Sequence, residues 1–320
     1  MTMGLEQAFR EAVTRFEQAV DTDGNPLGMK SLVVSSNGET IGHLFAGDVA
    51  YNVRSICKVV VALTVGIAAA DGVRLGSEPL SLDTDVGALL KQAPALRDLG
   101  GVDAWSGVKV AHLLSHTTGH DRGFLFRADI GGLDPDALLP YALSRPLDHE
   151  PGVHFAYSNV GYYLISALFQ ELLGRPFGDV AGELLLSKLG ITGATWRKRG
   201  KYTAGATGLE LRPADLHKLA ELVAGDGHYR GRRIAPKAWC ESMRSVFIRI
   251  PELYDPDDVL PKYGYGYGLW ICGDGRYFCW GTDGQYLIVV PDRDLVITTL
   301  ADQPDMEPIT SCLLPLLRPA

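Results

Sequence analysis

Apolar and polar positions in the first part of the chain predict a helix, a hairpin and a second helix. Apolar residues recur at helical spacing over 5–20, which predicts an amphipathic helix. Two short apolar runs, 31–36 and 41–47, flank an Asn-Gly pair that is typical of a β-hairpin. The segment 55–72 is apolar on every face, and its length and Ala-rich second half favour a buried helix over a strand.

The rest of the chain changes from helical to extended patterns. Residues from about 75 to about 200 predict mainly helices and loops, with helices over 159–174 and 179–190. A further helix over 212–227 has a proline just inside its start and a glycine at its end. From residue 263 onward, short β-branched and aromatic runs alternate with turn signals, which predicts an antiparallel meander.

The order of these elements, strands followed by a long helical insertion and more strands, indicates an α+β fold with both chain ends in the sheet lobe. The length of 320 residues favours one large domain, 1–320, over two full domains. We expect a sheet lobe of about 1–72 and 205–320, and a mostly helical lobe of about 73–204 inserted between its strands.

Composition and charge limit the classes of function. The net charge is −8 and no block of basic residues occurs, which disfavours nucleic acids and anionic membranes as partners. The chain contains no run of about 18 uncharged apolar residues, and charges interrupt its N-terminus, so neither a membrane span nor a signal peptide is expected. An odd number of cysteines without metal-site spacing predicts free thiols and a cytoplasmic location: Cys57, Cys240, Cys272, Cys279 and Cys312.

Ser55 and Lys58 stand at the start of the apolar 55–72 segment. On a helix they share one face, since they are three positions apart. Lys58 could extend to the surface and stay charged. If its amine is buried instead, lost hydration lowers the lysine pKa toward neutrality, and a neutral amine can take the proton of the Ser55 hydroxyl. By itself this spacing also occurs by chance.

Tyr157 and Asn159 lie two positions apart at the turn into the predicted 159–174 helix. Both side chains can point into one cleft, where a tyrosine hydroxyl can relay protons beside a lysine and an amide can donate to a substrate carbonyl. The alternative is that Asn159 or Ser158 simply caps the helix.

Trp280, Gly281 and Thr282 lie on a predicted strand near the C-terminus. A glycine there allows a ligand to approach the strand backbone closely. A backbone N–H of this strand and that of Ser55 could together form an oxyanion hole. The alternative is an ordinary β-bulge or turn.

Together these motifs resemble the serine β-lactamase and penicillin-binding-protein superfamily, and most closely its class C β-lactamase and esterase branch. The likeness runs in the family's order over about 25–310 and includes the segments "VKVAHLLSHTTGH" and "PGVHFAYSNVGYYLI". It implies a β-lactamase/transpeptidase-like fold, in which a central antiparallel sheet with helices on both faces forms a three-layer α/β/α lobe. It implies no metal and no organic cofactor.

The resemblance also assigns roles to individual residues. Ser55 would be the acylated nucleophile and Lys58 its proton partner. Tyr157 would act as the general base and acid, and Asn159 would orient the substrate. The N–H groups of Ser55 and Thr282 would bind the oxyanion. Since protons on Lys58 and Tyr157 are coupled, a single-residue base is only one description.

One position departs from the family pattern. The third motif usually begins with lysine or histidine, but here Cys279-Trp280-Gly281 stands in its place. That cation helps hold a substrate carboxylate, so its loss argues against β-lactams and D-alanyl-D-alanine peptides as main substrates. Arg276, on the same predicted strand, could take its place.

Several other residues have both a functional and a structural interpretation. His112, His116 and His120 are four apart, but Gly119 and two threonines break a helix there, so a structural turn is favoured over a metal site. Cys57, next to Lys58, is expected to pack rather than react. An aromatic cleft rim is expected from five residues: Phe126, Tyr265, Tyr267, Trp270 and Trp280.

The sequence therefore predicts a serine hydrolase that forms an acyl-enzyme on Ser55. Its expected substrate is a small-molecule ester or amide. The main alternative is an acyltransferase that passes the acyl group to an amine or alcohol. A non-catalytic binding protein of the same fold is the remote alternative. The acyl donor, the acceptor and the oligomeric state are not indicated by the sequence.

Overall fold

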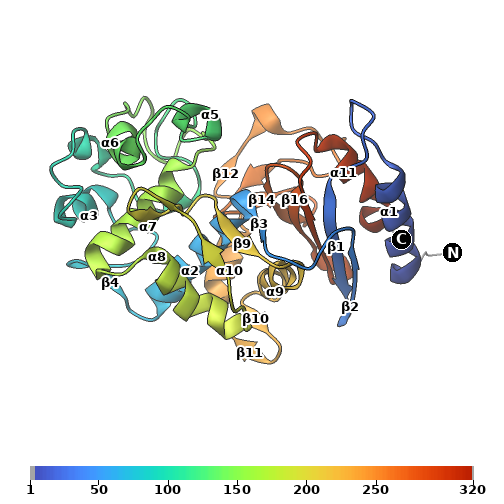
Figure 1. The fold of residues 1–320 in the computed structure, drawn as a ribbon. Helices are drawn as coiled ribbons and strands as arrows, with labels where there is room; N and C mark the ends of the chain where they lie inside the picture. The colour runs from blue at the N-terminus through green and yellow to red at the C-terminus, as the bar shows by residue number, and fades with distance from the viewer. Residues whose placement is uncertain (1–3, 319–320) are drawn as a thin grey trace.

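Eight strands form one antiparallel sheet in the computed structural model, which describes residues 4–318 (Figure 1). In spatial order the strands are β12 (Ile248–Arg249), β13 (Gly264–Tyr265), β14 (Trp270–Ile271), β15 (Tyr277–Gly281), β16 (Gln285–Val290), β17 (Leu295–Ala301), β1 (Met29–Ser36) and β2 (Glu39–Leu44). Pairing of β1 with β17 joins the N-terminal hairpin to the C-terminal meander. Both predicted strand groups are confirmed, and the hairpin turn falls at the predicted Asn-Gly pair.

Helices cover both faces of this sheet. On one face lie α1 (Leu5–Gln18), α11 (Glu307–Cys312) and α12 (Leu314–Leu317); on the other lie α2 (Cys57–Ala70) and α9 (Pro213–Ala224). Alternation along β17 serves both layers, since Leu295 and Ile297 belong to the first core while Val296 and Leu300 belong to the second. The predicted α+β, three-layer architecture is confirmed.

The chain between α2 and α9 consists of helices, loops and a few short strands, and it lies to one side of the sheet (Figure 1). Its helices are α3 (Val86–Gln92), α4 (Val110–Leu114), α5 (Arg127–Ile130), α6 (Leu138–Leu143), α7 (Val160–Leu173) and α8 (Phe177–Ala181), and α10 (Lys237–Met243) follows α9. One three-stranded sheet and three strand pairs complete the fold over residues 4–318, and their strands are β3 (Tyr51–Asn52), β4 (Arg74–Leu75), β5 (Glu78–Pro79), β6 (Thr195–Trp196), β7 (Lys198–Arg199), β8 (Tyr202–Thr203), β9 (Leu209–Leu211), β10 (His228–Tyr229) and β11 (Arg232–Arg233).

One predicted helix is less regular than expected. The 179–190 segment is α-helical only to Ala181, then continues as a π-helical turn, Gly182–Leu186, and a 3₁₀ turn, Ser187–Leu189. The apolar spacing was sufficient to predict a helix but not the hydrogen-bond type. By contrast, α7 ends at Gly174 in the left-handed conformation that the terminal glycine predicted.

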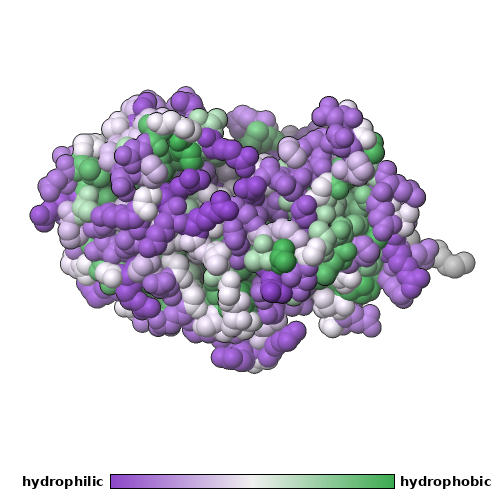
Figure 2. Space-filling view, in the orientation of Figure 1, coloured by the Kyte–Doolittle hydropathy of each residue, from purple (hydrophilic) through white to green (hydrophobic). Residues whose placement is uncertain are grey.

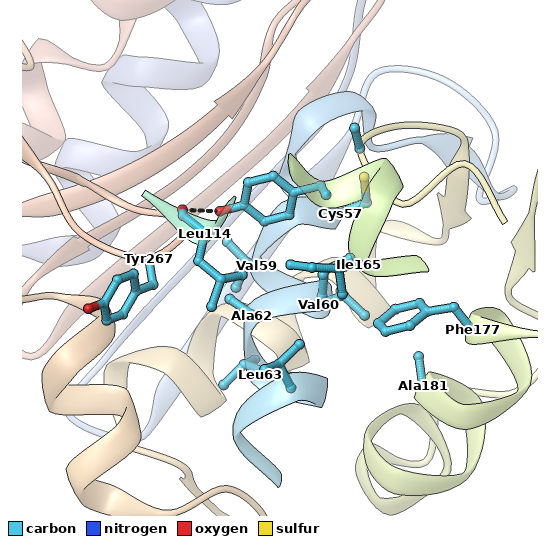
Figure 3. Packing of buried hydrophobic residues seen from close by; sticks show 14 of the residues in the cluster. Cys57, Val59, Val60, Ala62, Leu63, Leu114, Ile165, Phe177, Ala181 and Tyr267 are labelled. Atoms are coloured by element: carbon cyan, nitrogen blue, oxygen red, sulfur yellow. Dashed lines mark hydrogen bonds between the residues drawn. The ribbon is translucent and has the colours of Figure 1, made fainter. Parts of the chain in front are cut away.

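Helix α2 is the buried centre of the molecule. Residues 57–68 are all buried, and Figure 3 shows Val59, Val60 and Leu63 enclosed by side chains of α4, α7 and α8. This confirms the expectation that an all-apolar segment forms a central helix. The α-helix begins at Cys57, because Arg54–Ile56 forms a preceding 3₁₀ turn. Because this turn leads directly into the buried helix, packing of the core fixes the position of residues 54–56.

Surface properties agree with the composition. Hydrophilic residues cover most of the face in Figure 2, and apolar residues show only in small groups. All five cysteines are buried and free, as predicted. Over residues 4–318, every helix is too short or too polar to span a bilayer.

Candidate active site

Ser55 lies on the 3₁₀ turn that leads into α2, where its half-buried side chain lines a cavity of about 610 Å³. The preceding residue, Arg54, has a φ of 52°, and its N–H donates to the Asn52 side chain at 2.9 Å. This left-handed residue turns the chain sharply before the helix. The turn exposes the Ser55 hydroxyl to the cavity while the next helical turn enters the core.

Lys58 is fully buried one helical turn beyond Ser55. Its Nζ lies 3.0 Å from Ser55 Oγ, 2.9 Å from Asn159 Oδ1 and 3.1 Å from the Ala206 carbonyl oxygen. All three partners are uncharged, so no carboxylate compensates the lost hydration. Burial therefore lowers the pKa of Lys58 to about 8. The structure excludes the surface-lysine alternative.

Tyr157 lies beside this pair, in the loop before α7. Its ring centroid is 5.0 Å from Lys58 Nζ, and the ring stacks on Trp270 with centroids 5.7 Å apart. Burial raises the pKa of Tyr157, and hydrogen bonding to Ser55 acts in the opposite direction. The phenol is thus a protonated donor at neutral pH.

Asn159 connects the lysine to the opposite wall of the cavity. Its Oδ1 accepts from Lys58, and its Nδ2 donates to the Leu125 carbonyl at 2.9 Å. Although Asn159 occupies the N-cap position of α7, its side chain makes no capping bond. Ser158 does so instead, since its Oγ accepts from the Val160 N–H at 3.2 Å. Asn159 therefore faces the cavity and contacts Lys58, while its neighbour Ser158 caps the helix.

Strand β15 passes directly against the Ser55 turn. A Cβ built on Gly281 would lie 2.5 Å from Arg54 Cβ and 3.0 Å from the Ser55 nitrogen. Trp280 and Thr282 line the same cavity as Ser55. Only glycine allows this approach, so the glycine of the third motif brings the backbones of Thr282 and Ser55 together.

His116, for which the sequence predicts only a place in a structural turn, packs against Tyr157 in the structure. It is buried with a φ of 59°, and its Nδ1 accepts from the Ser158 N–H at 3.2 Å. The proton is therefore on Nε2, which lies 3.2 Å from Tyr265 Oη. Burial and the charge of Lys58 hold the pKa of His116 well below its usual value. The neutral imidazole packs against the Tyr157 ring, with ring centroids 4.3 Å apart, and helps fix the position of the tyrosine. The resemblance of "LLSHTTGH" to the family was the only signal for it.

Two expectations about the cavity wall are wrong. Arg276 precedes β15 at its far end, pairs with Asp274 and donates to the Val259 carbonyl. It stands five residues from Gly281, roughly 16 Å along a strand, so it cannot replace the missing cation.

Of the predicted aromatic rim, only Phe126 and Trp280 line the cavity. The other three members, Tyr265, Tyr267 and Trp270, are buried in the core. A strand's aromatic residues could not be assigned to a face from its sequence alone.

A possible metal-ligand group lies elsewhere, at Asp121, His149 and His154. These residues bond to one another, since His149 Nε2 is 3.2 Å from the Asp121 carboxylate and His154 Nε2 is 2.9 Å from the Asp121 carbonyl oxygen. None of the three lines the Ser55 cavity.

A serine beside a buried lysine, next to an interior strand of an antiparallel sheet with helices on both faces, places the protein in the β-lactamase-like class. The chain belongs to the Beta-lactamase family, whose model matches residues 13–310.

Solved structures share this fold. EstCE1, a hydrolase with promiscuous acyltransferase activity, superposes with a TM-score of 0.72 at 15% identity, over 97% of this chain and 98% of that chain. The octameric penicillin-binding protein homologue from Pyrococcus abyssi gives 0.69 at 19% identity, over 98% of this chain and 77% of that chain. At such identities the likeness shows the fold alone.

Curated relatives match over a shorter length. Two proteins of Dichelobacter nodosus, both described as fimbrial assembly proteins, are 32% and 31% identical over 122 and 123 residues. The match spans 37% of this chain, and 29% and 30% of the two relatives.

The close approach at Gly281 predicts a strong effect of one added methyl group. In Gly281→Ala, the new Cβ pushes β15 away from the Ser55 turn, so the rate at which a fluorophosphonate labels Ser55 falls at least about tenfold and stability falls by about 1–3 kcal/mol. The matched control is Gly42→Ala on β2, where the nearest atom to the new Cβ is 3.6 Å away. Labelling and thermal melting measure both effects. Equal labelling rates in Gly281→Ala and the unmodified protein would contradict the argument.

Proposed function

We propose that this protein is a serine hydrolase that acts on small-molecule esters or amides through an acyl-enzyme on Ser55. The observation that carries the proposal is the 3.0 Å contact between Ser55 Oγ and the Nζ of a buried lysine without a charged partner. A serine hydroxyl is a poor nucleophile until a base takes its proton. The half-buried serine faces a cavity of about 610 Å³, within the range of small-molecule sites.

The first half-reaction begins with neutral Lys58. A neutral amine keeps two N–H donors, for Asn159 and Ala206, and directs its lone pair toward Ser55. Lys58 takes the hydroxyl proton as Ser55 Oγ attacks the substrate carbonyl carbon. The backbone N–H groups of Ser55 and Thr282 donate hydrogen bonds to the carbonyl oxygen and stabilise the negative charge that develops on it.

The second part of the cycle expels the leaving group and then releases the acyl group. Tyr157 donates its proton to the departing oxygen or nitrogen and regains one from Lys58, so the pair shares a single proton. Water then attacks the ester on Ser55, giving its proton to the same pair, and Ser55 leaves as the free hydroxyl. Asn159 keeps the amine in place throughout.

The substrate is proposed to be an ester or amide other than a β-lactam. Cys279 occupies the strand position where the family's cation would hold the β-lactam carboxylate, and Arg276 precedes β15 at its far end. Acyl transfer is the second candidate, since it uses the same adduct. The structural likeness to EstCE1 supports acyl transfer as a candidate, because EstCE1 is a hydrolase with promiscuous acyltransferase activity.

Replacement of the nucleophile tests the proposal directly. With 4-nitrophenyl acetate, intact-mass analysis should show one acetyl group on Ser55 in the unmodified protein, and Ser55→Ala should lose both the adduct and turnover. The matched control is Ser36→Ala, a serine on β1 outside the cavity. A Ser55→Ala protein that retains normal turnover would refute the acyl-enzyme. Absence of any adduct would favour the binding-protein alternative.

The lowered pKa of Lys58 predicts a pH dependence. If the neutral amine is the base, kcat/KM rises with pH through an apparent pKa of about 8. Because this pKa lies below the unfolded value, the penalty for burying Lys58 is full below pH 8 and disappears as pH rises from 8 to about 10.5. Lys58→Arg, whose guanidinium stays protonated, should lower kcat/KM by roughly 10²–10⁴ and remove this limb. A kcat/KM that stays constant from roughly pH 6 to 10 would count against lysine as the base.

Hydrolysis and transfer are separated by their products. With an ester donor and rising concentrations of a primary amine or alcohol, a hydrolase forms mainly the free acid, because water reaches the adduct first. A transferase forms mainly the amide or new ester. Chromatography of both products, with Ser55→Ala as the blank, measures the ratio. If the amide or new ester exceeds the free acid at millimolar acceptor, acyl transfer replaces hydrolysis as the proposed function.

A further inference from the structure

Four arginines line the cavity that contains Ser55, although the protein as a whole carries a net charge of −8. They are Arg54, Arg127, Arg197 and Arg199, and among residues 4–318 the only carboxylate lining this cavity is that of Asp283. A cleft with charges of one sign and low-dielectric walls concentrates ligands of the opposite sign.

Asp283 neutralises only part of this charge. Its Oδ2 lies 2.7 Å from Arg54 and 3.5 Å from Arg127. The ion pair between Arg54 and Asp283 is part of the folded structure, since both side chains are mostly buried, at 26% and 12% exposure. Arg127, on α5, is 77% exposed and shares a carboxylate that is already paired. Its guanidinium is therefore available to a ligand.

The opposite wall contributes two more guanidinium groups. Arg197 lies 3.2 Å from the Glu210 carboxylate. Arg199, on β7, is exposed, and its guanidinium pairs with no carboxylate among residues 4–318. Of the four, Arg199 and Arg127 thus keep most of their capacity to bind an anion.

We propose that the substrate carries a carboxylate, which Arg127 and Arg199 bind while its ester or amide carbonyl reaches Ser55. This inference rests on the proposed function and specifies its substrate class. A guanidinium matches a carboxylate in a two-point hydrogen bond. The anion is held by α5 and β7, away from the position on β15 where Cys279 replaces the family's cation. A monoanion suits the available charge, because the other two arginines are paired.

The test compares esters that differ only in charge. One pair, 3-acetoxybenzoate and 3-acetoxybenzamide, places the carboxylate on the leaving group. The other, the 4-nitrophenyl monoesters of 4-carboxybenzoic and 4-carbamoylbenzoic acid, places it on the acyl group. We expect the anionic member of one pair to have a kcat/KM at least about tenfold higher, and the pair shows on which side the carboxylate lies. The preference should fall when salt rises from about 0.05 to about 0.5 M.

Arginine variants then locate the site. Arg199→Gln and Arg127→Gln should each reduce the anionic-to-neutral ratio at least about fivefold. Arg10→Gln on α1, where the side chain is 76% exposed and remote from the cavity, makes the same charge change and should leave the ratio within about twofold.

The outcomes separate this inference from the function on which it rests. If no ester acylates Ser55, the proposed function fails. If the neutral esters acylate Ser55 as fast as the anionic ones, the function stands and the carboxylate inference is overturned. A preference that survives both arginine variants would also overturn it, because the anion would then bind elsewhere.

Discussion

The burial of the Lys58 amine without a charged partner is the constraint on which the site depends. A protonated amine in the core is costly unless it is paired. Here its partners are a hydroxyl, an amide and a backbone carbonyl, so the cost is reduced by hydrogen bonds but not removed. The protein stabilises the neutral form instead, with a pKa near 8. The result is a base that is partly deprotonated near physiological pH.

The same three contacts hold separate parts of the fold together. Ser55 belongs to the turn before α2, Asn159 stands at the start of α7, and Ala206 lies in the loop before β9. Asn159 extends the connection to Leu125, on the loop that forms another wall of the cavity. Because α2 is enclosed by apolar side chains, the lysine cannot move to relieve its burial. Packing in the core thus fixes the geometry at the site.

Sequence reasoning succeeded where the signal was local or periodic. The hairpin, α2, α7 and the meander follow from short-range patterns, and Ser55 with Lys58 lies within one helical turn. It failed where the answer depended on which end or face of an element points to the cavity. Arg276 directly precedes the strand of Gly281, at the end far from the cavity, and Arg199 lies on a two-residue strand whose sequence has no periodic pattern. Local sequence predicts a turn around His116 but not its contacts, because its partners, Ser158 and Tyr265, are distant in sequence.

One ion pair sets the relation between the two predicted oxyanion donors. Arg54 precedes Ser55, Asp283 follows Thr282, and their side chains meet at 2.7 Å. Both charged residues have positive φ values, 52° and 69°, a conformation that costs a non-glycine residue about 1 kcal/mol or more. The mostly buried ion pair offsets this cost, while Gly281 leaves room for the two backbones to approach. The strain at Arg54 and Asp283 is therefore part of what places the Ser55 and Thr282 backbones at one wall of the cavity.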